Sequence, residues 1–383
     1  MTDTPNPADS ARQQPEMPTG EVLAGEVLAR REGALARLSL NRPKAIHALN
    51  RSMCEAMSEA LAEWGNDNEA PVVVLIDHAQ GRGFCAGGDV VMVRRSALED
   101  GGEAGRAFFH DEYRLNHQLF TYEAQTSVPV VAFMDGITMG GGVGLSQPAR
   151  YRVATQNTRF AMPESGIGLF PDVGGGWYLS RLKGRLGQWL ALTGARMDGA
   201  ECLWAGLATH YLQAEALPEA RARMAAGEAP GAVLDELAVP APEPAVAAHA
   251  DDIARHFAFD SYEAILASLR ADGGEWAQGA LAMLSGKSPL TCKVALRQLA
   301  IGLTLPDFAA NMAMEYRLAA RMIAQPDFAE GVRAVLVDKD AGRDGAPRWN
   351  PAAPEGVSEA MTDAIFAPLP AGQEWTPLEW KKP

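Results

Sequence analysis

Short apolar runs alternate with longer amphipathic stretches along the first half of the chain. Runs with the length and the β-branched content of buried strands lie around Val27 and at 36–40, 72–76, 129–134 and 151–154. Apolar residues recur at helical spacing from Met53 to Trp64 and again across 103–125. Strands that alternate with helices in this way predict an α/β fold with a parallel sheet and right-handed crossovers.

The second half of the chain has no such strand runs. Residues 213–250 are rich in Ala, Glu and Pro and predict helix and linker, and helical spacing returns at 251–270 and 275–335. We therefore expect a disordered tail at 1–19, a core at 20–212, a helical C-terminal region at 213–351 and a surface tail at 352–383.

Three successive glycines, Gly140 to Gly142, follow the apolar run at 129–134 and open a short helical stretch. Glycine lets a ligand approach the backbone closely, and the first N–H groups of a helix have no internal partner. These N–H groups suit a developing oxyanion better than a phosphate, because no Lys-Ser or Lys-Thr follows as in a P-loop. Taken alone, the run is better explained by close helix packing.

Two acidic residues, Glu164 and Asp172, each follow a proline in the glycine-rich loop at 160–176. Pro163 and Pro171 exclude a continuous helix between the two acids, and the glycines permit a folded path that brings both carboxylates to one cavity. Two carboxylates in one apolar cavity have divergent pKa values, which is a usual basis for paired acid and base catalysis. The spacing alone is equally consistent with two surface acids that cap neighbouring helices.

The segments at 83–89 (GFCAGGD) and 135–142 (DGITMGGG) resemble the two oxyanion loops of the crotonase (enoyl-CoA hydratase/isomerase) superfamily. The run at 160–176 (FAMPESGIGLFPDVGGG) is more specific and resembles the 3-hydroxyisobutyryl-CoA hydrolase branch of that superfamily. The resemblance implies a crotonase-like spiral of ββα units at 20–212. It also implies that the helical region at 213–351 closes an acyl-CoA site.

The resemblance implies roles for individual residues. Two backbone N–H groups, carried over to Ala86 and Gly141, would hold the thioester oxygen. Glu164 would attack the thioester or activate water, and Asp172 would handle protons and orientation. Glu112 matches a Glu-Tyr pair that reaches the acyl pocket, so it would bind substrate together with Gly141, Glu164 and Asp172.

One absence distinguishes branches of the superfamily. Hydratases in it use two glutamates, and the first of these positions is Gly144 in this chain. A glycine cannot donate or accept a catalytic proton. The expected function is therefore hydrolysis of a short 3-hydroxyacyl-CoA, and the resemblance points to 3-hydroxyisobutyryl-CoA in valine degradation. An enoyl-CoA hydratase or isomerase that uses Glu164 alone, and a non-catalytic acyl-CoA-binding protein, remain as alternatives.

A serine hydrolase is poorly supported, because the chain has no GxSxG motif and neither Ser146 nor Ser165 has an identifiable histidine partner. The formal net charge of -14 argues against general binding to nucleic acid or to anionic membranes. An anionic CoA thioester would then need local cations, and Arg42 and Lys44 are candidates for its phosphates. No cofactor is expected, because CoA is part of the substrate.

Four isolated cysteines, with no CxxC pair and no Cys/His group at zinc-ligand spacing, indicate a reducing compartment and predict no metal site. The N-terminal residues lack the apolar core of a signal peptide, and no apolar run approaches membrane-spanning length. We therefore expect a cytoplasmic protein. The superfamily commonly forms trimers and hexamers, so a homo-oligomer is an open alternative, although the helical extension could cover that interface.

Overall fold

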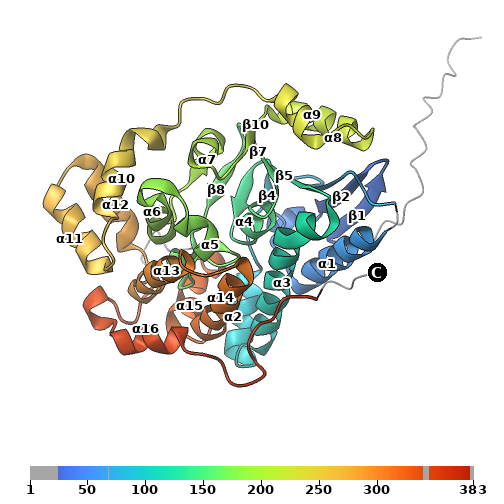
Figure 1. The fold of residues 1–383 in the computed structure, drawn as a ribbon. Coiled ribbons are helices and arrows are strands. Elements are labelled where there is room, and N and C mark those ends of the chain that lie inside the picture. Colours follow the sequence, from blue (N-terminus) through green and yellow to red (C-terminus); the bar gives the residue numbers. More distant parts are fainter. Residues whose placement is uncertain (1–24, 68, 340–344, 380–383) are drawn as a thin grey trace, which may run out of the picture.

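Two β-sheets form the framework of the computed structural model, which describes residues 25–67, 69–339 and 345–379 (Figure 1). The tail expected at 1–19 lies outside these residues. The larger sheet has the order β1-β2-β3-β5-β7-β10. Its strands are β1 (Val27–Glu32), β2 (Leu35–Leu40), β3 (Val73–His78), β5 (Val130–Met134), β7 (Tyr151–Ala154) and β10 (His210–Tyr211). Only the β1–β2 pair is antiparallel among these described strands, so the predicted parallel sheet is confirmed.

A smaller sheet of very short strands lies beside the larger one. It consists of β4 (Gly83–Cys85), β6 (Ile137–Met139), β8 (Arg159–Ala161) and β9 (Met197–Asp198), with β9 antiparallel to β8. The sequence pattern did not predict these strands. Each of β4, β6 and β8 follows one strand of the larger sheet and precedes a helix. The chain therefore repeats a strand–strand–helix unit three times.

Helices pack on the inner face of the large sheet and against the short strands. They are α1 (Arg51–Asn66), α2 (Val90–Glu99), α3 (Glu103–Thr126), α4 (Gly141–Ser146), α5 (Gly175–Ser180), α6 (Leu186–Thr193) and α7 (Gly199–Ala205). The stripe from Met53 to Trp64 is buried on α1 and packs against α3. Asn50 caps α1 and Asp89 caps α2, because each side chain accepts a hydrogen bond from the backbone N–H three residues later.

Two further helices, α8 (Leu217–Ala225) and α9 (Pro230–Leu237), cover the outer face of the large sheet. Val73 and Leu75 of β3 pack with these helices, whereas Val74 and Ile76 face the main core. Because both faces of the strand are covered, β3 shows a continuous apolar run rather than an alternating one. Residues 213–250 thus contain helices and a connecting segment that leads from α9 to α10 across one side of the molecule (Figure 1).

The remaining helices form a layer beside α3, α5 and α6. They are α10 (Ala250–His256), α11 (Tyr262–Asp272), α12 (Glu275–Ser285), α13 (Pro289–Gly302), α14 (Phe308–Met322) and α15 (Pro326–Val332), followed by a π-helical turn at Arg333–Val337. In this layer α14 packs on α3, α13 packs on α5 and α6, and α15 packs on α2.

The segment expected as a surface tail at 352–383 carries one more helix, α16 (Glu359–Phe366), which packs on α13 and α14. Beyond this helix the buried Trp375 lies against His117, and its Nε1 donates to His110 O at 3.2 Å. The described part of this segment is therefore attached to α3 by its aromatic side chain.

Candidate active site

Three buried carboxyl groups meet beside the N-terminus of α4. Glu112 comes from α3, Glu164 opens the 3₁₀ helix Glu164–Ile167, and Asp172 lies in the loop before α5. These residues are 1%, 5% and 4% exposed, so none is a surface cap. A Cβ placed on Gly141 would lie 2.7 Å from Glu112 Oε1, and one placed on Gly140 would lie 3.2 Å from Glu164 Oε1.

Burial changes the ionisation of all three acids. It raises the pKa of Glu112 and the pKa of Glu164 well above the usual range, and the neighbouring Asp172 charge adds to both shifts. Burial also raises the pKa of Asp172 to about 7, although a hydrogen bond from Tyr113 OH to Asp172 Oδ2 at 2.9 Å acts in the opposite direction. The acids therefore hold protons in a pH range where exposed carboxyl groups are ionised.

A half-buried lysine approaches Glu164 from the turn before α13. Burial lowers the pKa of Lys287, and the Lys287 charge in turn favours the ionised form of Glu164. A Cβ placed on Gly166 would lie 3.4 Å from Lys287 Nζ. Ser288 donates its backbone N–H to Ser165 O at 3.1 Å, which joins the turn to the short helix that carries Glu164.

Backbone N–H groups converge on the same place. Gly141 begins α4, and its N–H therefore has no acceptor within the helix. Ala86 was expected as the second oxyanion donor, but its N–H donates to Ile46 O at 2.9 Å, so the structure corrects this expectation. On the same loop, Gly88 N–H has no backbone acceptor among the described residues, and a Cβ on Gly88 would lie 3.8 Å from Glu112 Oε1. Gly88 is thus the better candidate for the second donor.

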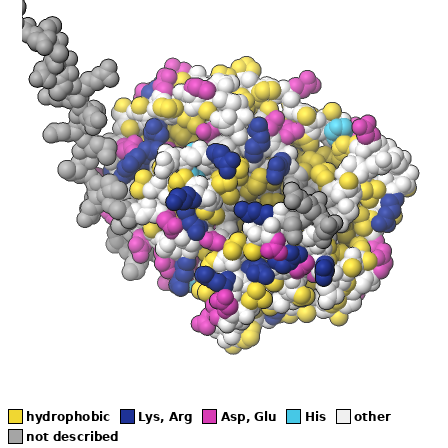
Figure 2. Space-filling view, turned by 180° about the vertical axis from the view of Figure 1, so that it is seen from behind, with side chains coloured by type: hydrophobic (Ala, Val, Ile, Leu, Met, Phe, Trp, Pro, Cys, Tyr) yellow, Lys and Arg dark blue, Asp and Glu magenta, His cyan; other side chains and the backbone are white. Residues whose placement is uncertain are grey.

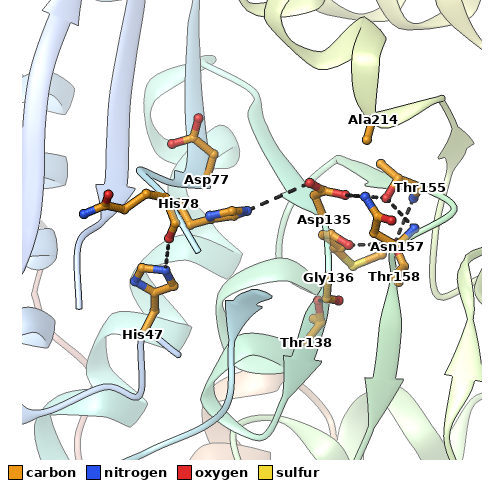
Figure 3. Close-up of polar contacts among 12 residues, drawn as sticks. His47, Asp77, His78, Asp135, Gly136, Thr138, Thr155, Asn157, Thr158 and Ala214 are labelled. Carbon is orange, nitrogen blue, oxygen red and sulfur yellow. Dashed lines mark hydrogen bonds and ion pairs between the residues drawn. The ribbon is translucent and has the colours of Figure 1, made fainter. Parts of the chain in front are cut away.

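A polar network holds the starting points of both oxyanion loops (Figure 3). His47 is fully buried, and its Nε2 lies 2.8 Å from Gln80 O, just before the first loop. His78 at the end of β3 lies 4.0 Å from Asp135 at the end of β5. Asp135 also accepts a hydrogen bond from Thr155 Oγ1 at 2.6 Å, which connects it to the end of β7. The network therefore ties together the ends of three neighbouring strands from which the site is built.

The C-terminal helical region fixes the loop that follows Asp172. The carboxylate of Glu315 on α14 accepts Gly174 N–H at 2.7 Å and Gly176 N–H at 2.8 Å, and the Asn311 amide donates to it at 2.9 Å. Burial raises the pKa of Glu315 to about 8, and these hydrogen bonds oppose that shift. A residue distant in sequence thus holds the backbone that presents Asp172.

Comparison with known proteins gives the family. Residues 35–366 match the enoyl-CoA hydratase/isomerase family. The chain belongs to that family. Among curated relatives, the mitochondrial 3-hydroxyisobutyryl-CoA hydrolase of Xenopus tropicalis is 41% identical over 372 residues, which cover 94% of this chain and 93% of that protein. The human protein of the same name is 39% identical over 356 residues, which cover 90% of this chain and 89% of that protein. The family resemblance seen in the sequence is confirmed.

Two solved structures share the fold over most of this chain. A carnitinyl-CoA dehydratase from Mycobacterium thermoresistibile has a TM-score of 0.85 and 38% identity, covering 92% of this chain and 98% of that one. An enoyl-CoA hydratase from Rhodobacter sphaeroides 2.4.1 has a TM-score of 0.82 and 35% identity, covering 92% and 100%. These similarities confirm the α/β crotonase fold with its helical C-terminal region.

Gly144 of this family member faces buried neighbours. A Cβ at this position would lie 2.7 Å from Asn116 Nδ2 on α3 and 2.7 Å from Val173 Cβ, beside Asp172. Both distances are shorter than real Cβ contacts, so a larger side chain would displace α3 or the loop. The structure therefore leaves no room for a glutamate side chain at Gly144, the position where the resemblance places the first glutamate of the hydratases.

Arg42 and Lys44, the two residues expected to contact the CoA phosphates, differ in their surroundings. Arg42 is engaged within the chain, because its guanidinium contacts Glu26 at 3.0 Å and Asp89 at 2.9 Å and donates to Ala48 O. Lys44 is exposed, and no hydrogen bond or ion pair to a described residue is found for it. Lys44 is therefore the freer of the two cations to contact a CoA phosphate.

Several site features were not predicted from the sequence. Lys287, Gly88 and Glu315 received no role, and Asn116 had only its helical spacing from Glu112 as a signal.

In the described part of the chain, no three His, Cys, Asp or Glu side chains are arranged to hold a metal ion. None of its helices is long and apolar enough to cross a membrane. The vertebrate relatives are named mitochondrial, so the comparisons do not support the expected cytoplasmic location.

Proposed function

We propose that the protein hydrolyses the thioester of a short 3-hydroxyacyl-CoA, with 3-hydroxyisobutyryl-CoA as its substrate. The observation that carries the proposal is the buried, electrostatically interacting pair of Glu164 and Asp172, with Glu164 Oε1 3.2 Å from a Cβ placed on Gly140, just before α4. Such a pair supplies a nucleophile or base and a second proton carrier, which thioester hydrolysis needs. The names of the curated relatives support the same activity.

The first step is polarisation of the thioester carbonyl. The Gly88 and Gly141 N–H groups would donate to the carbonyl oxygen as negative charge develops on it. Removal of one donor of this kind typically slows an enzyme roughly 10²–10³-fold. Because both donors are backbone groups on glycines, no side chain blocks the approach of the acyl group.

The Glu164 carboxylate, whose ionised form the Lys287 charge favours, then attacks the carbonyl carbon and forms a mixed anhydride. The C–S bond breaks, its electron pair leaves with sulfur, and Asp172 passes its proton to the departing CoA thiolate. Water next attacks the anhydride and gives its proton to Asp172, which releases the hydroxy acid and restores Glu164. A pKa of about 7 suits this exchange, because Asp172 must give up and recover a proton in each cycle.

The main alternative within this function assigns Glu164 the role of general base. Glu164 would then take a proton from water, and the resulting hydroxide would attack the thioester without an acyl-enzyme. Glu164 Oε2, for which the described residues offer no hydrogen-bond partner, is compatible with either role. We favour the anhydride, because the family resemblance implies it and the same oxyanion donors serve direct carboxylate attack.

Enoyl-CoA hydration is the second candidate, since two similar solved structures carry dehydratase and hydratase names. The closed position at Gly144 argues against it, because Glu164 alone would have to supply both proton transfers. An acyl-CoA-binding protein without activity is the third alternative.

A direct comparison of two substrates tests the proposal. Purified protein would be assayed for free thiol released from 3-hydroxyisobutyryl-CoA and, in parallel, for loss of the enoyl absorbance of crotonyl-CoA. We expect thiol release to be much faster than hydration. Comparable or faster hydration would overturn the hydrolase proposal, and binding without either reaction would favour the non-catalytic alternative.

The cellular context is a proposal as well. As the resemblance implies, we assign the reaction to valine breakdown, with no cofactor beyond the CoA of the substrate. The four isolated cysteines, and not the comparisons, are the reason to place it in the cytoplasm. Assembly into a homo-oligomer is compatible with this assignment, and size-exclusion chromatography with light scattering would test it.

A further inference from the structure

Asn116 is a fully buried amide on α3, one helical turn beyond Glu112. Neither its Nδ2 nor its Oδ1 has a hydrogen-bond partner among the described residues. Leaving a buried polar group unpaired costs about 1–3 kcal/mol, so native proteins contain few such groups. The two unpaired atoms of one side chain therefore point to a ligand that pairs with both.

The surroundings of Asn116 belong to the candidate active site. On α4, Gly141 and Gly144 lie three residues apart and thus on one face of the helix. Gly141 faces Glu112 and Gly144 faces Asn116, each with 2.7 Å between the position of a Cβ and the nearest polar atom of α3. The same Cβ position at Gly144 lies 2.7 Å from Val173, the residue that follows Asp172. Asn116 therefore extends the row of polar groups that begins at the proposed oxyanion donor.

The charges of the site restrict what Asn116 can bind. An amide offers two N–H donors and one carbonyl acceptor. A carboxylate or phosphate would satisfy only the donors, and the burial that raises the pKa of Glu112, Glu164 and Asp172 would also disfavour a negatively charged ligand. A hydroxyl group is neutral, and it can accept from Nδ2 while it donates to Oδ1.

We infer that Asn116 binds the hydroxyl group of the acyl chain and thereby selects 3-hydroxyacyl thioesters over unsubstituted ones. The inference rests on the proposed function, since it places the thioester carbonyl at Gly141. Gly144 is about 4.5 Å further along the helix axis, at 1.5 Å per residue. That offset matches the reach from an acyl carbonyl to a substituent on its third carbon. Asn116 is thus a specificity-determining residue for the acyl group.

Two substrates that differ only in the hydroxyl group test this role. Wild type and Asn116→Leu would be assayed with 3-hydroxyisobutyryl-CoA and with isobutyryl-CoA. A site that pairs with a substrate hydroxyl discriminates strongly against the analogue that lacks it. We expect kcat/KM for the hydroxylated substrate to fall about 10–100-fold in the variant and kcat/KM for isobutyryl-CoA to change less than about threefold. An equal fall with both substrates would overturn the inference.

Two further variants separate recognition from folding. Asn116→Asp keeps the shape of the side chain and an acceptor but loses both amide donors. It should therefore also reduce the ratio of kcat/KM for 3-hydroxyisobutyryl-CoA to kcat/KM for isobutyryl-CoA. Gln118→Leu removes another buried amide of α3, which donates to Ser58 O on α1 instead of facing α4. Whatever its effect on the melting temperature, this control should leave the ratio of kcat/KM for the two substrates at the wild-type value. A comparable change in the ratio for Gln118→Leu would contradict a specific role for Asn116.

Binding by the wild-type protein provides a test that does not depend on catalysis. Non-hydrolysable thioether analogues with and without the hydroxyl would be compared by calorimetry, and the hydroxylated analogue should bind more tightly. Equal affinities would refute the role of Asn116. Failure of the wild type to release thiol from any acyl-CoA, with this preference intact, would instead refute the proposed function.

Discussion

Asp172 shows how a single buried acid links stability to activity. Its pKa is raised from 3.8 to about 7, mainly by burial. Between these two pH values the folded protein binds a proton that the unfolded chain has released, so this group makes the free energy of unfolding fall as pH rises from about 4 to about 7. The loss is at most about 4 kcal/mol and is complete above the folded-state pKa.

Asp172→Asn should therefore be more stable than wild type at pH 8, with a difference that shrinks toward zero near pH 4. The Asn carbonyl can still accept from Tyr113 OH, so the local hydrogen bond survives. Urea unfolding at pH 5 and pH 8 measures the difference, and kcat should fall strongly at both. A stability difference that is the same at both pH values would show that Asp172 does not titrate between them.

Glu164 is the residue whose exact role separates two mechanisms. If it forms an anhydride, hydroxylamine should trap the acylated side chain. Water that attacks the Glu164 carbonyl of this anhydride should, over multiple turnovers in ¹⁸O-water, place solvent oxygen in Glu164, which is detectable in the peptide mass. Glu164→Gln should abolish turnover and leave substrate binding largely intact. Product formation without label or adduct at Glu164 would make general-base hydrolysis the better explanation.

At the scale of secondary-structure elements, the loop between Asp172 and α5 depends on α14. Glu315 offers acceptors to two backbone N–H groups of that loop, whereas Gln in its place would present an N–H₂ group to one of them. We expect Glu315→Gln to lower the free energy of unfolding by about 1–3 kcal/mol. It should also reduce kcat more than it raises KM and move the limb of the pH profile that belongs to Asp172. Lost stability with unchanged kcat and pH profile would limit Glu315 to a structural role.

The sequence predicted the long elements well because their apolar periodicity is strong. The helix expected at 103–125 is α3, Glu103–Thr126, and the strand expected at 151–154 is β7. The smaller sheet was missed because strands of two or three residues, such as Gly83–Cys85, are too short to show a period. Such strands are defined only by their partners, which come from distant parts of the chain.

The site was predicted in part for a similar reason. Side chains that carry chemistry, such as Glu164 and Asp172, can be recognised by residue type and motif. Ala86 and Gly88 are distinguished as oxyanion donors by the hydrogen bond that Ala86 N–H already donates to Ile46 O. This bond joins segments that are distant in the sequence, so it can be seen only in the folded structure. The environment of Asn116 is also tertiary, because it arises where α3 meets α4 and the loop after Asp172.

At the scale of the whole molecule, an acidic protein must bind a polyanionic substrate. The net charge is -14, yet Lys and Arg side chains gather around a hollow lined by apolar side chains on the face shown in Figure 2. Arg94, Arg333 and Arg348 line a cleft between α2, α15 and the segment at 345–348, together with one acid, Glu330, which pairs with Arg333. Local positive charge of this kind can attract CoA phosphates although the molecule as a whole repels them.

Binding of the substrate should therefore weaken as ionic strength rises, because exposed charges are screened over about 8–10 Å at 0.1–0.15 M salt. Lys44 is exposed and unengaged, so Lys44→Ala should raise KM several-fold at low salt with little change in kcat. Arg42→Ala should also raise KM if Arg42 contacts phosphate, but it removes the ion pairs with Glu26 and Asp89 and should therefore lower stability as well.

Lys183→Ala, at an exposed lysine in the turn between α5 and α6, is the control and should leave KM unchanged. If KM of the Lys44 and Arg42 variants matches wild type at low ionic strength, neither residue binds the phosphates, and the arginine-lined cleft becomes the place to look for them.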